Sequence, residues 1–325
     1  MLFILLPKAL RTVLDYNDWV GISRCQTWAQ HMTQRKQLAL FSDRSPQPAE
    51  HAVGGGVVVR EVQCKSLLNR GGLDNYSFNC YTGCQNGCVY CYVRFMQRFH
   101  PHDEPWGRFV DVKVNAPEVL ARQLRRLAPG SVFTCSACDG WQPVERHYRL
   151  TRRCCQMLLE AGFRLNILTK SELVLRDLDI FAGGKVCLGV TITTPDETQA
   201  KAWEPGASSV TARVKVLKTA KSAGLETTVM FGPLLSGISD TPDALDELFG
   251  LAARVQVDRI WTDALNLRPR VWPSIQAFLR SRRPELLPLY GRVLFDQAHR
   301  SRYVAELHAC IQRAAAKAAV SDRLA

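Results

Sequence analysis

The sequence lacks long apolar runs and the common motifs of phosphate binding and nucleophilic hydrolysis. No stretch of its 325 residues approaches the ~20 consecutive apolar residues of a transmembrane helix. P-loop, GxGxxG, nucleophile-elbow and paired-carboxylate patterns are missing, and the 7 histidines show no metal-type spacing. The sequence therefore offers no motif for an NTPase, a dinucleotide dehydrogenase or a serine hydrolase, and we expect no membrane partner.

Cysteine is too sparse for a disulfide scaffold. The 12 cysteines are partly clustered, which favours metal or redox chemistry in a reducing compartment. A signal sequence is not expected: the apolar start is interrupted by Pro7 and Lys8, lacks a positive leading region and has no small-residue cleavage site. We therefore expect a cytoplasmic protein.

The formal net charge of +12 suits a polyanionic partner such as nucleic acid, although solvated helix faces account for it equally well. At helical i, i+3, i+7 spacing, Arg146, Arg149 and Arg153 are predicted to share one face of a helix. No aromatic residues interleave with them in a known RNA-binding pattern. Arg152 lies beside these three residues in the sequence. A second basic group consists of Arg122, Arg125 and Arg126.

Strand-like and helix-like segments alternate from about residue 57 onward. The predicted strands are 75–79, 131–137, 164–170, 185–194, 225–232 and 258–265, and the predicted helices are 116–127, 146–162, 173–184, 208–224 and 242–255. Near-continuous apolar strands indicate a parallel sheet that is covered on both faces. Right-handed crossovers then predict an α/β fold, a partial or full TIM-like (βα)6 barrel with its chemistry at the carboxyl ends of the strands.

Three parts are expected along the chain. Residues 1–57 are an N-terminal extension or reflect a mis-assigned start, with Met32 as an internal start candidate. Residues 58–296 form the core domain, and residues 297–325 form a C-terminal helix.

Four cysteines lie in the segment NCYTGCQNGCVYCYVR (79–94), and three of them form C-x3-C-x2-C: Cys84, Cys88 and Cys91. Thiolates select zinc or iron–sulfur clusters, and a closed zinc site needs four ligands. Three cysteines on one loop leave one iron of a [4Fe–4S] cube free to take a small-molecule chelate. Cys80 is the candidate fourth ligand, and we expect it to be a bystander.

This loop, with Tyr90 just before the last cysteine, resembles the signature of the radical S-adenosylmethionine (radical SAM) superfamily. The blocks WQPVERHYRLTRR, ILTKSELVLRDLDIF, and TITT followed by EPGAS resemble its spore photoproduct lyase-like group, over roughly residues 57–296. The resemblance implies a [4Fe–4S] cluster, S-adenosylmethionine cleaved to a 5′-deoxyadenosyl radical, and a flavodoxin- or ferredoxin-type electron donor.

The same resemblance suggests a lyase-like repair reaction on nucleic acid. Two alternatives stay open. The first is a radical SAM enzyme that acts on a protein, a tRNA or a small molecule. The second is a non-catalytic iron–sulfur or zinc protein for electron transfer or interaction.

The resemblance also assigns residues to the cofactor site. Asp139 has an alternative role as the cap of the following helix, and Thr191 and Thr193, alternating on a predicted strand, could equally fill the barrel interior. The implied contacts are Tyr90 with adenine, Cys138 and Asp139 with the methionine moiety, Lys170 with its carboxylate, and Thr191 and Thr193 with the ribose.

Cys135 is the candidate catalytic residue, as a hydrogen donor to the product radical. Lyases of the group carry a cysteine near this strand end, but Cys135 is one residue out of step with it. Because Cys135 alternates with Ala137 on the predicted strand, it could instead face the barrel wall. Cys135 and Cys138 could also share a metal with Cys154 and Cys155, which we consider geometrically awkward.

Overall fold

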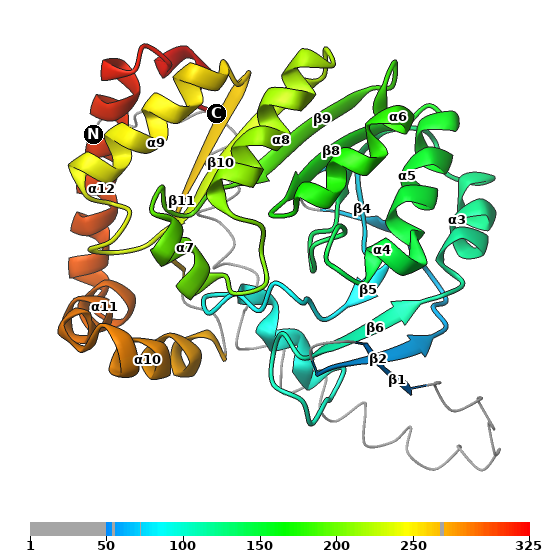
Figure 1. Cartoon of the computed structure of the whole chain (residues 1–325), viewed down its shortest axis with the longest axis horizontal. Coiled ribbons are helices and arrows are strands. Elements are labelled where there is room, and N and C mark those ends of the chain that lie inside the picture. Colours follow the sequence, from blue (N-terminus) through cyan, green and yellow to red (C-terminus); the bar gives the residue numbers. More distant parts are fainter. Residues whose placement is uncertain (1–49, 54–55, 72, 267–269) are drawn as a thin grey trace, which may run out of the picture. The chain divides into compact units, whose positions relative to one another are not determined.

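The computed structural model describes residues 50–53, 56–71, 73–266 and 270–325. The described residues up to Leu324 belong to one compact unit that contains two sheets (Figure 1). Most of the predicted extension, residues 1–49, lies outside the described residues. The last part of the predicted extension contains β1 (Glu50–Val53), which pairs antiparallel with β2 (Val57–Val62). The predicted boundary at residue 57 therefore falls inside a sheet.

The main sheet has seven strands in the order β11-β10-β9-β8-β7-β4-β3. The six strands from β4 to β11 are parallel neighbours, and β3 pairs antiparallel with β4. Within the described chain the edge strands β3 and β11 do not pair with each other, so the barrel is partial. The predicted six-stranded parallel α/β fold is confirmed. The strands are β3 (Asn69–Arg70), β4 (Tyr76–Phe78), β7 (Ser131–Thr134), β8 (Arg164–Thr169), β9 (Val186–Thr191), β10 (Glu226–Leu234) and β11 (Arg259–Ala264).

Helices follow the strands and cover the sheet (Figure 1). Side-chain caps fix where two of them begin: Ser209 accepts from the N–H of Ala212 in α8, and Thr241 accepts from that of Ala244 in α9. β9 is buried along its whole length, as a central strand covered on both faces must be. The helices between the strands are α3 (Ala116–Leu124), α4 (Glu145–Tyr148), α5 (Leu150–Glu160), η5 (Glu172–Asp177), α6 (Leu178–Phe181), α7 (Glu197–Trp203), α8 (Val210–Ser222) and α9 (Pro242–Val255).

The predicted helix 146–162 is wrong as one element. Arg149 adopts a left-handed conformation with φ 52° and separates α4 from α5. The buried carboxylate of Glu145 explains the break, because it accepts from the N–H groups of Thr151 and Arg152 at 3.1 and 3.0 Å and so caps α5. Arg146, Arg149 and Arg153 therefore do not share one helical face.

The second sheet has the order β1-β2-β6-β5, with β5 at Tyr81–Thr82 and β6 at Phe109–Lys113. A 3-10 helix, η4 (Tyr92–Arg98), lies between these two strands in sequence and packs beside α10 (Val271–Arg282). The chain then continues through η6 (Pro284–Leu286), α11 (Leu287–Phe295), α12 (Gln297–Lys317) and η7 (Ser321–Arg323). Among the described helices, none has the length and apolar character needed to cross a membrane.

Candidate cofactor site at the mouth of the barrel

The cysteine loop lies between β5 and η4, just beyond the carboxyl end of β4. Cys84 and Cys88 are buried, Cys91 is half-buried, and all three thiols are free. Gly87, between the first two cysteines, has φ 60°, a left-handed conformation that glycine adopts without steric cost. The loop is therefore a tight curl that keeps three soft ligands close together.

The donor set of three thiols is of the soft type that holds iron–sulfur clusters. Ligands of one ion converge on one point, and no three His, Cys, Asp or Glu side chains in the described part of the chain do so. Each thiolate of a cube instead binds its own iron. Burial raises the pKa of the Cys88 thiol to about 12, against the opposing effect of Lys170, so cluster binding has to displace protons.

The EPGAS segment (204–208) forms a wall against the cysteine loop. Gly206 donates its N–H to the carbonyl of Asn86 at 3.0 Å, and Val89 donates to the carbonyl of Trp203 at 2.9 Å. A Cβ atom at position 206 would lie 2.0 Å from the carbonyl oxygen of Gln85. Only glycine permits this approach, so the wall depends on residue 206.

Three of the predicted cofactor residues meet at one buried carboxylate, that of Glu204. The hydroxyls of Tyr90 and Thr193 both donate hydrogen bonds to Glu204 Oε1, and the distance from Thr193 Oγ1 is 2.8 Å. Lys170 Nζ lies 4.0 Å from the same oxygen. Lys170 Nζ also lies 5.8 Å from the centre of the Tyr90 ring, within range of a cation–π contact. The sequence analysis gave Glu204 no role, although it opens the EPGAS block.

Arg213 completes this group, which we call the Glu204 site (Tyr90, Lys170, Thr193, Glu204 and Arg213). Its Nη2 lies 2.5 Å from Glu204 Oε2, and Glu204 and Arg213 are each 1% exposed. Burial alone would raise the pKa of Glu204, but Arg213 and then Lys170 outweigh burial and lower it. Burial lowers the pKa of Lys170, but Cys88 and Glu204 raise it more. The carboxylate and both cations are therefore charged at neutral pH.

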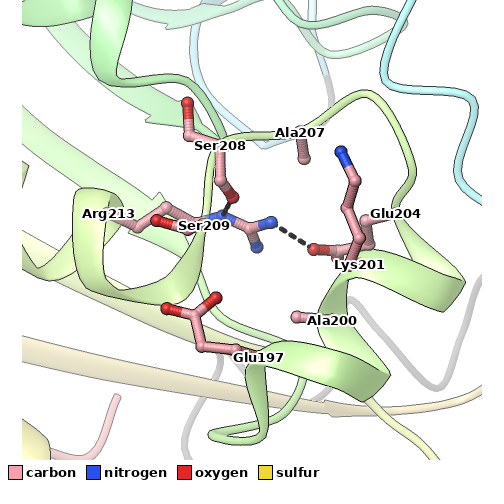
Figure 2. A pocket seen from close by; sticks show the side chains of 8 residues that line it. All are labelled: Glu197, Ala200, Lys201, Glu204, Ala207, Ser208, Ser209 and Arg213. Carbon is pink, nitrogen blue, oxygen red and sulfur yellow. Dashed lines mark hydrogen bonds and ion pairs between the residues drawn. The ribbon is translucent and has the colours of Figure 1, made fainter.

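Figure 2 shows Glu204 and Arg213 facing each other at a cavity of about 260 Å³ beside α7 and the start of α8. The carboxylate of Glu197 accepts from the N–H groups of Val210 and Thr211 at 2.8 and 2.7 Å. The amino-terminal end of α8 is thus satisfied by a protein carboxylate and not left open to an anionic ligand.

Asp139 is a hub of hydrogen bonds and not a helix cap. Its carboxylate accepts from Asn86 Nδ2, Thr169 Oγ1 and the N–H of Lys170 at 2.9, 2.7 and 2.8 Å, and from the N–H of residue 141 at 3.0 Å. The next helix begins only at Glu145, so the capping alternative is wrong. Asp139 instead connects the cysteine loop, through Asn86, to the backbone N–H of Lys170.

Cys135 does not lie on a strand, contrary to the predicted alternation. β7 ends at Thr134, and Cys135 has φ 65° and is buried. A Cβ atom on Gly140 would lie 2.3 Å from Cys135 Sγ, so the sulfur packs directly against that glycine. Cys138 is half-buried, with its Sγ 3.7 Å from Asn79 Oδ1. Cys135 and Cys138 thus both lie in the loop that follows β7, and Cys135 is the more buried of the two.

The two threonines differ in a way that the sequence did not indicate. β9 ends at Thr191, so Thr193 lies beyond the strand and does not alternate with it. Thr193 uses its hydroxyl on Glu204, while the carbonyl of Thr191 accepts from Arg213 Nη1 at 3.0 Å. Of the two, Thr193 belongs to the Glu204 site through its side chain.

A second buried ionic group lies behind the mouth, within two of the blocks that carried the resemblance. Asp177 accepts from Trp141 Nε1, Arg152 Nη1 and Arg176 Nε at 2.8, 3.1 and 2.7 Å. Arg176 also bonds Glu145 at 3.1 Å. Arg152, counted above in a basic group, is therefore neutralised by carboxylates and holds α5 to η5.

Cys80 lies apart from the other loop cysteines. Its Sγ is 3.7 Å from that of Cys154, and both residues are fully buried in the main hydrophobic core. Cys88 packs instead with Tyr90 and Trp203, and Cys84 with Trp106. These contacts favour the expectation that Cys80 is a bystander.

Comparison with known proteins finds a matching family profile, relatives in sequence and a solved structure of similar fold. The sequence profile of the radical SAM superfamily matches residues 78–249. An uncharacterised protein of Mycobacterium bovis is 30% identical over 251 residues, which cover 72% of this chain and 73% of the relative. An uncharacterised protein of Methanocaldococcus jannaschii is 32% identical over 173 residues, 53% of this chain and 65% of the relative. A structure of spore photoproduct lyase with bound AdoMet and dinucleoside spore photoproduct has a TM-score of 0.62 at 18% identity, over 80% of this chain and 78% of the other.

Proposed function

The chain belongs to the radical SAM superfamily, and we propose that Cys84, Cys88 and Cys91 hold its [4Fe–4S] cluster while the Glu204 site holds S-adenosylmethionine. Enzymes of this superfamily bind both cofactors and take electrons from an external donor, so the chain is a radical SAM enzyme with these cofactors. The observation that supports the residue assignment is the set of three free thiols on one tight loop beside the Glu204 site.

Cys84, Cys88 and Cys91 would hold the cluster, which would supply the electron for reductive cleavage of S-adenosylmethionine into methionine and a 5′-deoxyadenosyl group able to take hydrogen from a substrate. The protein binds and orients the cofactor and excludes water. Lys170, whose side chain is 18% exposed, is the most accessible cation of the Glu204 site and binds the methionine carboxylate. Glu204 positions Lys170 and Tyr90, and Tyr90 is the residue that would contact the adenine.

Anaerobic reconstitution of the full chain tests this proposal. With a strong reductant and S-adenosylmethionine, the loaded protein should form 5′-deoxyadenosine. Lys170→Ala should load iron normally but bind S-adenosylmethionine more weakly, while Lys185→Ala, at an exposed position before β9, should match the wild type. A loaded wild-type protein that forms no 5′-deoxyadenosine would overturn the proposed activity.

For the substrate, we propose nucleic acid. The net charge of +12 favours a polyanion, and a solved structure of the same fold is named for a bound dinucleoside photoproduct. Next to the cysteine loop, Tyr92 and Phe99 are 52% and 59% exposed, and the guanidinium of exposed Arg98 lies 4.8 Å from the Phe99 ring. Exposed rings beside cations can stack on unpaired bases.

Binding to single-stranded and ultraviolet-damaged DNA tests the substrate class. Affinity should fall steeply with salt, and Phe99→Ala should weaken it severalfold. Phe295→Ala removes an equally exposed ring, 56%, from the end of α11 and should have no effect. Salt-independent or absent DNA binding would favour a protein, tRNA or small-molecule substrate instead.

A further inference from the structure

Three buried N–H donors of residues beside the cysteine loop have no acceptor among the described residues: Nε of Arg94, Nε1 of Trp106 and Nε1 of Trp203. Trp203 packs with Cys88, whereas Trp106 packs with Cys84 and Arg94 follows Cys91 in the chain. Of these three residues, Arg94 and Trp106 contact each other. A buried donor without a partner costs free energy, and native proteins rarely leave one. Such donors next to one loop therefore point to an acceptor that the polypeptide itself does not supply.

Arg94 is held against the loop from both sides. It lies one turn after Cys91, with its N–H 3.4 Å from the Cys91 carbonyl oxygen, and its Nη2 donates to the Cys88 carbonyl at 3.1 Å. The guanidinium carbon lies 5.9 Å from the Trp106 ring centre. Arg94 thus contacts Cys91 through its backbone N–H and Cys88 through Nη2 of its guanidinium, while Nε stays without an acceptor among the described residues.

Trp106 belongs to the same small hydrophobic cluster as the loop. It is 8% exposed and packs with Cys84, Val93 and Phe109, and Cys91 lies against this cluster. The ring is fixed by an edge contact with Phe109 at a centroid distance of 5.8 Å. The indole N–H is therefore a rigid donor in an apolar wall of the loop.

We propose that Arg94 Nε–H and Trp106 Nε1–H donate hydrogen bonds to sulfur atoms of the cluster held on this loop, and that they make the cluster easier to reduce. The proposal rests on the proposed role of Cys84, Cys88 and Cys91. Thiolate and sulfide sulfurs are hydrogen-bond acceptors, and such bonds and nearby positive charge stabilise the reduced cluster, which carries one more negative charge. Both residues are positioning residues that act through the cluster.

The test is a potentiometric titration of the reconstituted full chain, followed by electron paramagnetic resonance, after iron and sulfide have been counted for each variant. Arg94→Gln should lower the ratio of reduced to oxidised cluster about tenfold at a fixed potential, a shift of 59 mV for one electron. Arg94→Lys keeps the charge but loses the Nε donor and should shift less. Trp106→Phe keeps the ring without the donor and should shift in the same direction.

Arg98→Gln is the matched control, because Arg98 lies on the same helix but is exposed and stacks on Phe99. It should leave the potential unchanged. An Arg94→Gln shift no larger than that of Arg98→Gln would overturn the proposal. If Arg94→Gln does not load a cluster, the wild type grown with ¹⁵N-arginine decides: a ¹⁵N coupling to the reduced cluster in pulsed resonance supports the proposal, and its absence overturns it.

The two proposals fail separately. A wild type that loads no cluster, or a Cys84→Ala variant that loads one, contradicts the assignment of the cysteines. A wild type that loads the cluster and forms 5′-deoxyadenosine, with a potential insensitive to Arg94 and Trp106, contradicts only the role of these two donors.

Discussion

Replacing Arg213 with methionine should lower the free energy of unfolding by about 3–5 kcal/mol, because it leaves a buried carboxylate without its main partner. Arg213 Nη2 lies 2.5 Å from Glu204 Oε2, and both residues are 1% exposed. Arg213 also donates to the carbonyls of Ser208 and Thr191 at 2.9 and 3.0 Å, so two further acceptors lose their donor. Lys170 remains 4.0 Å from Glu204 and keeps the cost near the lower end of this range.

Urea denaturation of the cofactor-free chain at neutral pH, followed by tryptophan fluorescence, measures this loss without a contribution from cofactor binding. Arg259→Met is the control: Arg259 pairs with Glu226 at 2.7 Å but its side chain is 52% exposed, so its loss should cost less than about 1 kcal/mol. Adding Glu204→Gln to Arg213→Met should recover part of the loss, because no buried charge is then unpaired. The reasoning fails if Arg213→Met costs no more than the control, or if the double variant loses the sum of the single losses.

Three further outcomes are expected. Cys84→Ala should abolish cluster loading, measured as iron per chain, whereas Cys80→Ala should keep it at the wild-type level because Cys80 lies in the main core. Gly206→Ala should impair loading, since its Cβ would lie 2.0 Å from a backbone oxygen of the cysteine loop, while Gly291→Ala, in a helix with open space around the new atom, should load normally and gain about 0.5–1 kcal/mol. The pKa of Glu204 is lowered in the folded state, so its stabilising effect is present above its unfolded pKa of about 4.3 and is lost as pH falls through the folded pKa. The difference in unfolding free energy between wild type and Glu204→Gln should therefore be constant from about pH 8 to 6 and shrink only in acid.

The parallel sheet and the position of the site could be predicted because both follow from local pattern. Apolar runs mark the strands, and parallel strands bring the residues at their carboxyl ends to one edge. Lys170 after β8 and Thr193 after β9 meet Tyr90 of the cysteine loop for this reason. The short spacing of the three cysteines made the loop visible without any knowledge of the fold.

What the sequence did not reveal depends on contacts between distant residues. The break at Arg149 is set by the Glu145 carboxylate, which caps α5 across six residues. Cys135 leaves the strand early, with its sulfur packed on Gly140. Arg213 looks like any other cation of a solvated helix until the fold buries it on Glu204. Contacts of this kind leave no periodic pattern in the local sequence, so the sequence alone does not predict them.

The charges of the mouth indicate which cations remain available to a ligand. Asp139 already accepts from two side chains and two backbone N–H groups. Glu204 is shared by two cations: Arg213 pairs with it at 2.5 Å, while Lys170 stays at 4.0 Å. These two cations and one carboxylate carry a surplus positive charge, and Lys170 is the more exposed cation. A ligand carboxylate at Lys170 would compensate that surplus, and the negative charge of a thiolate-bound cluster would do the same for Arg94 beside Cys88 and Cys91.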